Sequence, residues 1–195
     1  MSASTVPRWP LVAVCGKFQP FHNEHLTYVL AAFDLGEHVV VGITNPDPTY
    51  VRDEVADPRR SRPESNPATY FERHLMVDRS LGDAGIAGDR YTIVPFPLNV
   101  PTSWFSYVPR DAVFLLTLYD DDPWLLERKA RLEGHGLITH VLWSRPAKGV
   151  VGTEVRRLIA EGGEWRQAVP PAVARVISER GIDARIRAGW VSPPG

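Results

Sequence analysis

The sequence predicts an α/β fold: an open, mostly parallel five-stranded sheet with helices on both faces. Five short runs of apolar, often β-branched residues have the length and composition of strands buried on both faces. Most of these runs are separated by segments whose apolar residues recur three and four positions apart, as on one face of a helix. A chain of 195 residues is long enough for one domain with a substantial core.

The first half of the chain alternates between these two patterns. A continuous apolar run, Leu-Val-Ala-Val-Cys, ends at Gly16, and the helical spacing that follows ends at Gly36, which we interpret as a helix stop. The elements expected here are, in order, a strand at 11–15, a helix at 23–35, a strand at 38–43, a helix at 68–84 and a strand at 91–94.

The second half continues the alternation and then becomes helical. The elements expected here are a strand at 112–118, a helix at 123–132, a strand at 138–143 and helices at 153–160 and 171–180. Two long segments, 44–67 and 95–109, lack periodicity and contain many of the 18 prolines. Segments of this kind are usually binding loops, lids or disordered. We expect a single domain over 11–187, a lead-in at 1–10 and a tail at 188–195.

The charge balance and the cysteine content exclude several classes of protein. Lys and Arg total 22 and Asp and Glu total 23, so the net charge is −1, whereas a nucleic-acid binder would carry an excess of basic residues. No apolar run approaches the roughly 18 residues of a membrane helix, and no signal-peptide core follows Met1. The single cysteine, Cys15, cannot form an intramolecular disulfide. We therefore expect a cytoplasmic protein with no nucleic-acid or membrane partner.

The segment Gly-Lys-Phe-Gln-Pro-Phe-His-Asn-Glu-His, residues 16–25, carries the strongest chemical signal. A buried strand ends here and a helix begins, and a helix N-terminus attracts anions through its unpaired N–H groups. Lys17 adds a charge, while His22 and His25 share one face of the first helical turn and can donate hydrogen bonds to phosphate. The favoured interpretation is a polyphosphate site. Two alternatives are a zinc-binding histidine pair and a purely structural turn.

A second segment, Gly-Val-Val-Gly-Thr-Glu-Val-Arg-Arg, residues 149–157, has the pattern of another loop-to-helix junction. Gly152 and Thr153 suit a helix start, and the Thr153 hydroxyl can hold phosphate together with the free N–H groups. Arg156 can point back at the same anion with its planar fork. Arg157 projects about 100° away around the helix, so we expect it at the surface.

Together the two segments resemble the signatures of the nucleotidylyltransferase superfamily with the His-x-Gly-His motif. The first is most similar to Gly-[Arg/Lys]-Phe-x-Pro-Phe-His-x-Gly-His of archaeal-type nicotinamide-mononucleotide adenylyltransferases, and the second to Ile-Ser-[Ser/Gly]-Thr-x-[Ile/Val]-Arg. The resemblance implies a Rossmann-like fold and attack on an NTP by a phosphate oxygen of the acceptor. The residues implied are Lys17, His22, His25 and Arg156 for catalysis, and Gly16, Phe18, Gln19, Gly152 and Thr153 for nucleotide binding.

Two positions depart from these signatures. Glu24 stands where the superfamily has glycine, and Val151 stands where it has serine. A carboxylate at position 24 adds bulk and negative charge beside the nucleoside, so it would instead hydrogen-bond a ribose hydroxyl or a different base. We therefore include Glu24 among the nucleotide-binding residues.

A third segment, Asn-Pro-Ala-Thr-Tyr-Phe-Glu-Arg, residues 66–73, resembles a helix opening of the same superfamily. Thr69 and Glu72 have the spacing of a capping box. For Arg73 we expect either an ion pair with Glu72 or, as the sharper alternative, a position near the triphosphate.

The acceptor side of the site is less clearly marked. Trp104, in the loop 95–109, is a candidate for stacking on a planar ring, with loop packing as the alternative. Arg59 and Arg62, in the loop 44–67, are candidates for binding a phosphate- or phosphonate-bearing acceptor, with a merely solvated loop as the alternative. The acidic run Asp120-Asp121-Asp122 suits either Mg²⁺ or a solvated helix start.

The expected activity is transfer of a nucleoside monophosphate from an NTP to a small phosphate-bearing acceptor, with release of pyrophosphate. AMP from ATP and nicotinamide mononucleotide as acceptor are the main expectation. The alternatives are a CTP-dependent cytidylyltransferase acting on a phosphonate or phosphorylated alcohol, and a non-catalytic nucleotide-binding regulator. Mg²⁺ would be carried by the NTP phosphates without protein ligands. A second copy of the chain is a further candidate partner, in a homo-oligomer.

Overall fold

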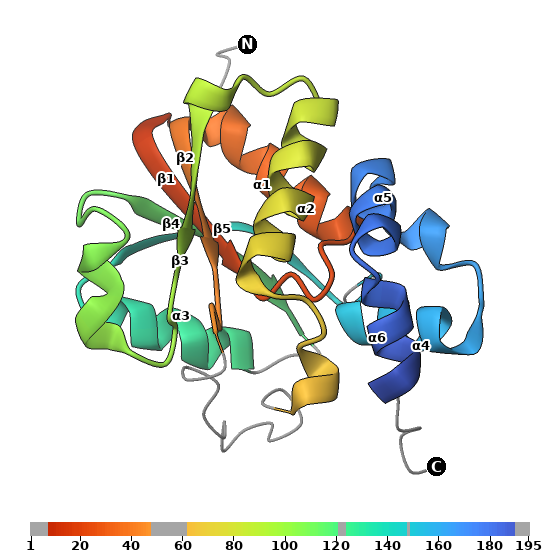
Figure 1. Cartoon of the computed structure of the whole chain (residues 1–195). Helices are drawn as coiled ribbons and strands as arrows, with labels where there is room; N and C mark the ends of the chain where they lie inside the picture. Colours follow the sequence, from red (N-terminus) through yellow and green to blue (C-terminus); the bar gives the residue numbers. More distant parts are fainter. Residues whose placement is uncertain (1–7, 48–61, 121–123, 148, 190–195) are drawn as a thin grey trace.

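A five-stranded sheet forms the centre of the computed structural model, which describes residues 8–47, 62–120, 124–147 and 149–189 (Figure 1). All pairs are parallel, and the strand order is β3-β2-β1-β4-β5. The strands are β1 (Trp9–Gly16), β2 (Gly36–Ile43), β3 (Tyr91–Pro95), β4 (Val113–Tyr119) and β5 (Ile138–Arg145). The predicted Rossmann-like α/β class and the five strands are confirmed.

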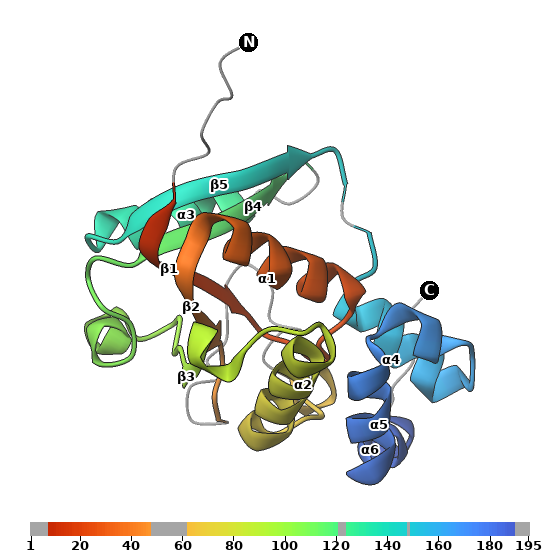
Figure 2. The same ribbon diagram turned by 90° about the horizontal axis from the view of Figure 1, so that it is seen from above.

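Helices cover both faces of this sheet (Figures 1 and 2). α1 (Asn23–Leu35) and α2 (Tyr70–Asp83) lie on one face, and α3 (Trp124–Gly134) lies on the other. α4 (Gly152–Glu161), α5 (Pro171–Glu179) and α6 (Ile182–Gly189) pack together, and α5 also contacts α2. The described parts of the connections contain the short 3-10 helices η3 (Pro63–Ser65), η4 (Gly88–Arg90), η5 (Pro101–Ser106) and η6 (Trp165–Ala168).

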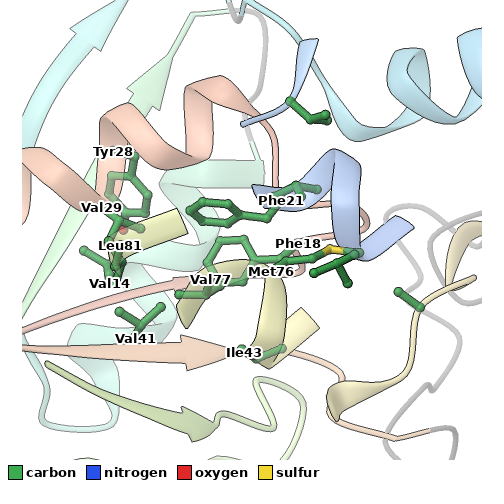
Figure 3. Packing of buried hydrophobic residues seen from close by; sticks show 14 of the residues in the cluster. Val14, Phe18, Phe21, Tyr28, Val29, Val41, Ile43, Met76, Val77 and Leu81 are labelled. Atoms are coloured by element: carbon green, nitrogen blue, oxygen red, sulfur yellow. The ribbon is translucent and has the colours of Figure 1, made fainter. Parts of the chain in front are cut away.

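Side chains of the central strands alternate between two cores, because successive residues of a strand point to opposite faces. Val12 and Val14 of β1 pack against α1 and α2 in the larger core, which Figure 3 shows from close by. Ala13 and Cys15 pack on the opposite face, with Leu132 of α3. Burial on both faces explains why the central strands are continuous apolar runs.

Most boundaries differ from the sequence prediction by one or two residues, and three differences are informative. β1 begins two residues earlier than expected, at Trp9. Gly36 does end α1, but it also begins β2, and a side chain there would collide with Val12. α6 was not predicted, because its buried apolar residues are only Ile182 and Ile186, a weak signal in an eight-residue helix. Within the described ranges, no helix has the length and apolar character to cross a bilayer.

Candidate active site

The carboxyl ends of β1 and β4 separate at the centre of the sheet. β1 pairs with β2 as far as Gly16, but its pairing with β4 is confined to Val12 and Ala13. Side chains bind carbonyl groups beyond that point: the Tyr28 hydroxyl donates to Leu115 O, and Arg128 Nη2 donates to Cys15 O at 3.1 Å. In open parallel sheets, ligands bind at this edge, where the strand order reverses.

The segment between β1 and α1, which we call the first junction (residues 16–23), is anchored by its aromatic side chains. Phe18 and Phe21 are fully buried in the larger core, with ring centroids 5.1 Å apart (Figure 3). Phe18 has a φ of 53°, an uncommon conformation for a residue with a side chain. Gly16 is required beside it, because a Cβ at that position would collide with the Phe18 ring. Phe18 is therefore a structural anchor, and its expected contact with nucleotide is not through an exposed ring.

The two histidines predicted to bind triphosphate lie together at the start of α1. Their rings are stacked, with centroids 3.6 Å apart. The backbone N–H of His22 donates to Nδ1 of His25 at 3.3 Å, so in the neutral His25 ring the proton is on Nε2. His25 is half-buried at the N-terminus of α1, where an anion is favoured.

His22 is the more deeply buried of the pair. Its side chain is 5% exposed, and within the described residues its Nδ1 is buried without a hydrogen bond. Burial lowers the pKa of His22 to about 4, because the charged form is poorly solvated there. The ring is therefore neutral near pH 7 in the absence of a ligand, and an adjacent polyanion would favour its protonation.

Gln19 connects the first junction to two other elements. Its side chain is buried and pairs with the backbone of Ala68, donating to the carbonyl at 2.8 Å and accepting from the N–H at 2.9 Å. Its own carbonyl accepts from Nη1 of Arg156 at 2.5 Å. The predicted nucleotide-binding role of Gln19 would therefore act through the position of the loop, since its amide is already occupied.

The second junction (residues 149–153) begins α4 against this carbonyl. A Cβ on Gly152 would lie 2.8 Å from Gln19 O, so only glycine allows the close approach. Nη2 of Arg156 donates to the Thr153 hydroxyl at 3.2 Å. Although Arg156 and the first junction are far apart in sequence, the fold brings them into direct contact, as the resemblance implies.

Arg156 is a buried cation, 7% exposed, and no acidic partner is present within the described residues. Burial lowers its pKa to about 10, so the guanidinium remains charged at neutral pH. A buried charge without a counter-charge is costly, and this cost is relieved by an anionic ligand. Its neighbour Arg157 instead binds Glu154 and Glu161 at the surface, as expected.

Glu24 extends from the first turn of α1 toward the second junction. Its carboxylate lies against Gly149, where an added Cβ would be 2.7 Å from Oε1. Oε2 is 3.7 Å from Nη1 of Arg145, at the end of β5. The residue that departs from the superfamily pattern thus contacts the β5–α4 connection.

Arg73 does not form the expected ion pair with Glu72. Glu72 caps Thr69 and pairs with Arg185 at 2.6 Å, whereas Arg73 is fully buried and binds backbone carbonyl groups. The carbonyl groups that accept from it are those of Lys17, Thr44, Asn45, Pro46 and Thr69. The predicted capping box is confirmed, but the Glu72–Arg73 ion pair was wrong. Arg73 holds the loop that carries Lys17 against the end of β2.

Of the three acceptor candidates, the structure describes Trp104 and Arg62. Trp104 is fully buried, its ring lies 5.5 Å from Phe96, and its Nε1 donates to Pro97 O. With no exposed face, the ring has no surface for stacking, so loop packing is the better interpretation. Arg62 is exposed and lies 3.9 Å from Glu64. Arg59, like Asp121 and Asp122, lies outside the described residues.

The described residues offer no protein cage for a metal ion. Nowhere in 8–47, 62–120, 124–147 and 149–189 do three or more His, Cys, Asp or Glu side chains gather in a group able to hold one. The zinc-pair alternative for His22 and His25 therefore finds no third ligand in this part of the chain. The site as described is built from cations, histidine N–H groups and two helix N-termini.

Comparison with known sequences agrees with this arrangement. The cytidylyltransferase-like family model matches residues 13–93. A phosphonoformate cytidylyltransferase from Streptomyces viridochromogenes is 50% identical over 173 residues, which cover 89% of this chain and 93% of that protein. A nicotinamide-nucleotide adenylyltransferase from Picrophilus torridus is 31% identical, with 89% of this chain and 94% of the relative covered.

Solved structures share the fold at much lower identity. A bifunctional NMN adenylyltransferase/ADP ribose pyrophosphatase from Francisella tularensis has a TM-score of 0.63 at 16% identity, and the match covers 92% of this chain but 52% of that one. A putative nicotinate-nucleotide adenylyltransferase from Vibrio parahaemolyticus has a TM-score of 0.55 at 14% identity. The nearly full-length sequence matches show that this chain belongs to the cytidylyltransferase-like family and is a nucleotidyltransferase.

Proposed function

We propose that this enzyme transfers a cytidylyl group from CTP to a small phosphonate-bearing acceptor and releases pyrophosphate. The observation that carries this proposal is the 50% identity, over 89% of the chain, to a phosphonoformate cytidylyltransferase. Of the activities expected from the sequence, this favours the CTP-dependent alternative over transfer of AMP to nicotinamide mononucleotide. The adenylyl activity remains the competing candidate, because a relative at 31% identity is a nicotinamide-nucleotide adenylyltransferase.

In the proposed reaction, an oxygen of the acceptor phosphonate attacks the α-phosphorus of CTP. A new P–O bond forms, the bond to the β-phosphate oxygen breaks, and pyrophosphate leaves with the electron pair. The attacking oxygen is already an anion, so no general base is needed. Catalysis then consists of positioning and charge stabilisation, as in other phosphoryl and nucleotidyl transfers.

The cationic side of the site would hold the triphosphate of the MgCTP substrate. Arg156 and the N-terminus of α4 neutralise charge from one side, and the Nε2–H of His25 donates from the other. His22 takes up a proton as the polyanion binds, and Lys17 contributes a further charge. These groups are fixed by the fold before the substrate arrives, so little reorganisation is required during reaction.

The acceptor would approach from the segment that follows β2. Arg62 is exposed there, and a guanidinium suits both phosphonate and carboxylate. We propose that Arg62 contacts the acceptor. The same role for Arg59 stays a prediction, because Arg59 lies outside the described residues. Trp104 is not part of the proposal, because its ring is buried in the core.

Pyrophosphate release, measured with each of the four common NTPs and with phosphonoformate, other small phosphonates or nicotinamide mononucleotide, tests the proposal. The expected result is turnover with CTP and a phosphonate, with at least tenfold higher kcat/KM than any other pair. Turnover confined to ATP and nicotinamide mononucleotide would reject it in favour of the adenylyl activity. Tight NTP binding without turnover for any acceptor would instead favour the regulator.

A further inference from the structure

Glu24 and Arg145 form an unusual pair at the entrance to the site. The Glu24 side chain is 33% exposed and the Arg145 side chain is 46% exposed, and their nearest charged atoms are 3.7 Å apart. This separation exceeds a hydrogen-bond distance. Among the described residues, neither side chain makes a hydrogen bond, so the carboxylate oxygens and the guanidinium N–H groups both retain their bonding capacity.

Each member of the pair is nevertheless held by the protein. The Glu24 carboxylate packs on the bare backbone of Gly149, where an added Cβ would lie 2.7 Å from Oε1. The Arg145 guanidinium lies over the ring of Trp143, 4.7 Å from its centroid. The N–H of Asp120 donates to the Arg145 carbonyl at 3.2 Å, which fixes the end of β5 against β4. An acceptor and a donor are therefore placed side by side before a ligand binds.

The location of the pair suits contact with the base of the nucleotide. Glu24 lies between His22 and His25 in sequence, but its side chain leaves the helix about 100° around the axis from His25. It faces the β5–α4 connection, whereas the histidines mark the triphosphate position. A nucleotide whose phosphates lie at the histidines and at the start of α4 can therefore extend its base along this side.

The order of donor and acceptor groups matches cytosine. The cytosine amino group is a donor that a glutamate accepts, and the adjacent ring nitrogen and carbonyl oxygen are acceptors for a guanidinium. Uracil and guanine have a carbonyl oxygen where cytosine has its amino group, so that oxygen would face the carboxylate. Adenine has the amino group but lacks the second carbonyl acceptor, and it is larger. The additional bulk of Glu24 relative to glycine also favours the smaller pyrimidine.

We propose that Glu24 and Arg145 read the Watson–Crick edge of cytosine and so select CTP, an inference that rests on the proposed function. Glu24 accepts from the amino group, and Arg145 donates to the ring nitrogen and the carbonyl oxygen. Gly149 belongs to the same device, because a side chain there would displace the carboxylate. Gly149 and Glu24 then act together in the selection of the base.

The test uses the full chain with Glu24→Gln and, separately, Arg145→Gln. An amide at position 24 can donate to the uracil oxygen, so the kcat/KM ratio of CTP to UTP should fall by about 10- to 100-fold. Arg145→Gln should weaken CTP use and lower the same ratio. Glu179→Gln is the matched control. Glu179 of α5 pairs with Arg79 of α2 at 2.7 Å, outside the site. The substitution removes the same charge and should leave the ratio unchanged.

A direct binding measurement separates recognition from chemistry. Calorimetric titration of CTP and UTP without acceptor should show the same change in relative affinity for Glu24→Gln. A CTP:UTP ratio that stays within threefold of the parent in both variants would overturn the inference, even if both activities fall together, since that is the effect of a purely structural pair. A parent enzyme that prefers ATP would instead reject the proposed function itself.

Discussion

The start of α1 and the start of α4 reach the same edge of the sheet, but different interactions hold them there. The first junction is fixed by its own side chains, since Phe18 and Phe21 are buried in the core. The second junction is anchored less deeply: Val150 is only partly buried against that core, and the N-cap residue, Val151, is exposed and makes no capping hydrogen bond. It contacts the first through Gly152 and Arg156 against Gln19 O, while Val155 and Ile159 farther along α4 are buried in the larger core. The first junction is a rigid platform, and the second is docked on it.

The two junctions also differ in charge. The first presents His22, neutral near pH 7 because burial lowers its pKa to about 4. The second presents Arg156, which remains charged although burial lowers its pKa to about 10. The first junction thus gains a charge at His22 when the ligand binds, in addition to the charge of Lys17, whereas the charge of Arg156 at the second is permanent. The following predictions test this division, from the largest expected effect to the smallest.

Replacing Arg156 with methionine removes both the charge and the hydrogen bond to Gln19 O that docks α4 on the first junction. We expect kcat/KM for nucleotidyl transfer to fall by about 10²–10³-fold, the usual effect of losing one donor to a developing charge. Arg157→Met is the matched control, because among the described residues that neighbour binds Glu154 and Glu161 at the surface and not the first junction. A similar loss in both variants would show that general charge, and not the docked guanidinium, matters.

The docking contact itself is tested by Gly152→Ala. Its Cβ would lie 2.8 Å from Gln19 O, so α4 must shift by several tenths of an ångström. We expect kcat/KM to fall by about tenfold, because displacement of positioned groups lowers the rate. Gly134→Ala is the control, since a Cβ there meets nothing within 4 Å, and the substitution in a helix is stabilising or neutral. Full activity of Gly152→Ala would contradict the tight docking of the second junction.

The contrast between the junctions also explains what the sequence could predict. A strand end, a glycine and a helix start are local patterns, so both junctions and all five strands were predictable. Arg73 and Glu24 were not, because their partners are determined by tertiary packing: Arg73 reaches Lys17, and Glu24 reaches Gly149. Trp104 was ambiguous for a similar reason, since an aromatic residue in a proline-rich loop suits both ligand stacking and burial. Only the fold shows that its ring lies on Phe96.

The charge difference predicts proton uptake at the first junction alone. A bound triphosphate raises the pKa of His22 from its low value, so binding takes up a proton and the affinity gains up to about tenfold per unit as pH falls from 7 to 5. In the absence of ligand, lowering the pH destabilises the folded protein. The pKa of His22 is lower in the folded chain than in the unfolded chain, so the unfolded chain binds this proton more readily, and the free energy of unfolding decreases as pH falls from about 6.5 toward about 4.

Calorimetry at pH 6 in two buffers with different ionisation enthalpies measures this uptake. His22→Gln should lower the number of protons taken up, because the amide cannot titrate, while protonation of the nucleotide itself is common to both proteins. Equal uptake in the parent and in His22→Gln would assign the proton to another group. His22 would then stay neutral when the triphosphate binds.

The smallest expected effect concerns the missing cap of the second junction. Val151 is 38% exposed with φ −120° and ψ 150°, the extended backbone of an N-cap residue, so a serine fits without strain. Val151→Ser should raise the free energy of unfolding by about 0.5–1 kcal/mol and Tm by about 1–4 °C, measured by thermal denaturation. Val151→Ala, which supplies no acceptor, is the control.

The activity of Val151→Ser then distinguishes two ways of holding α4. If contact with the first junction sets the position of α4, the added cap stabilises the helix but leaves kcat/KM within about threefold of the parent. A clear rise in kcat/KM would mean that the uncapped helix start limits the reaction, and that Arg156 and Gly152 do not by themselves hold it in register. In that case Val151 would lower the activity of the parent enzyme, and contact with the first junction would not be sufficient to position the second.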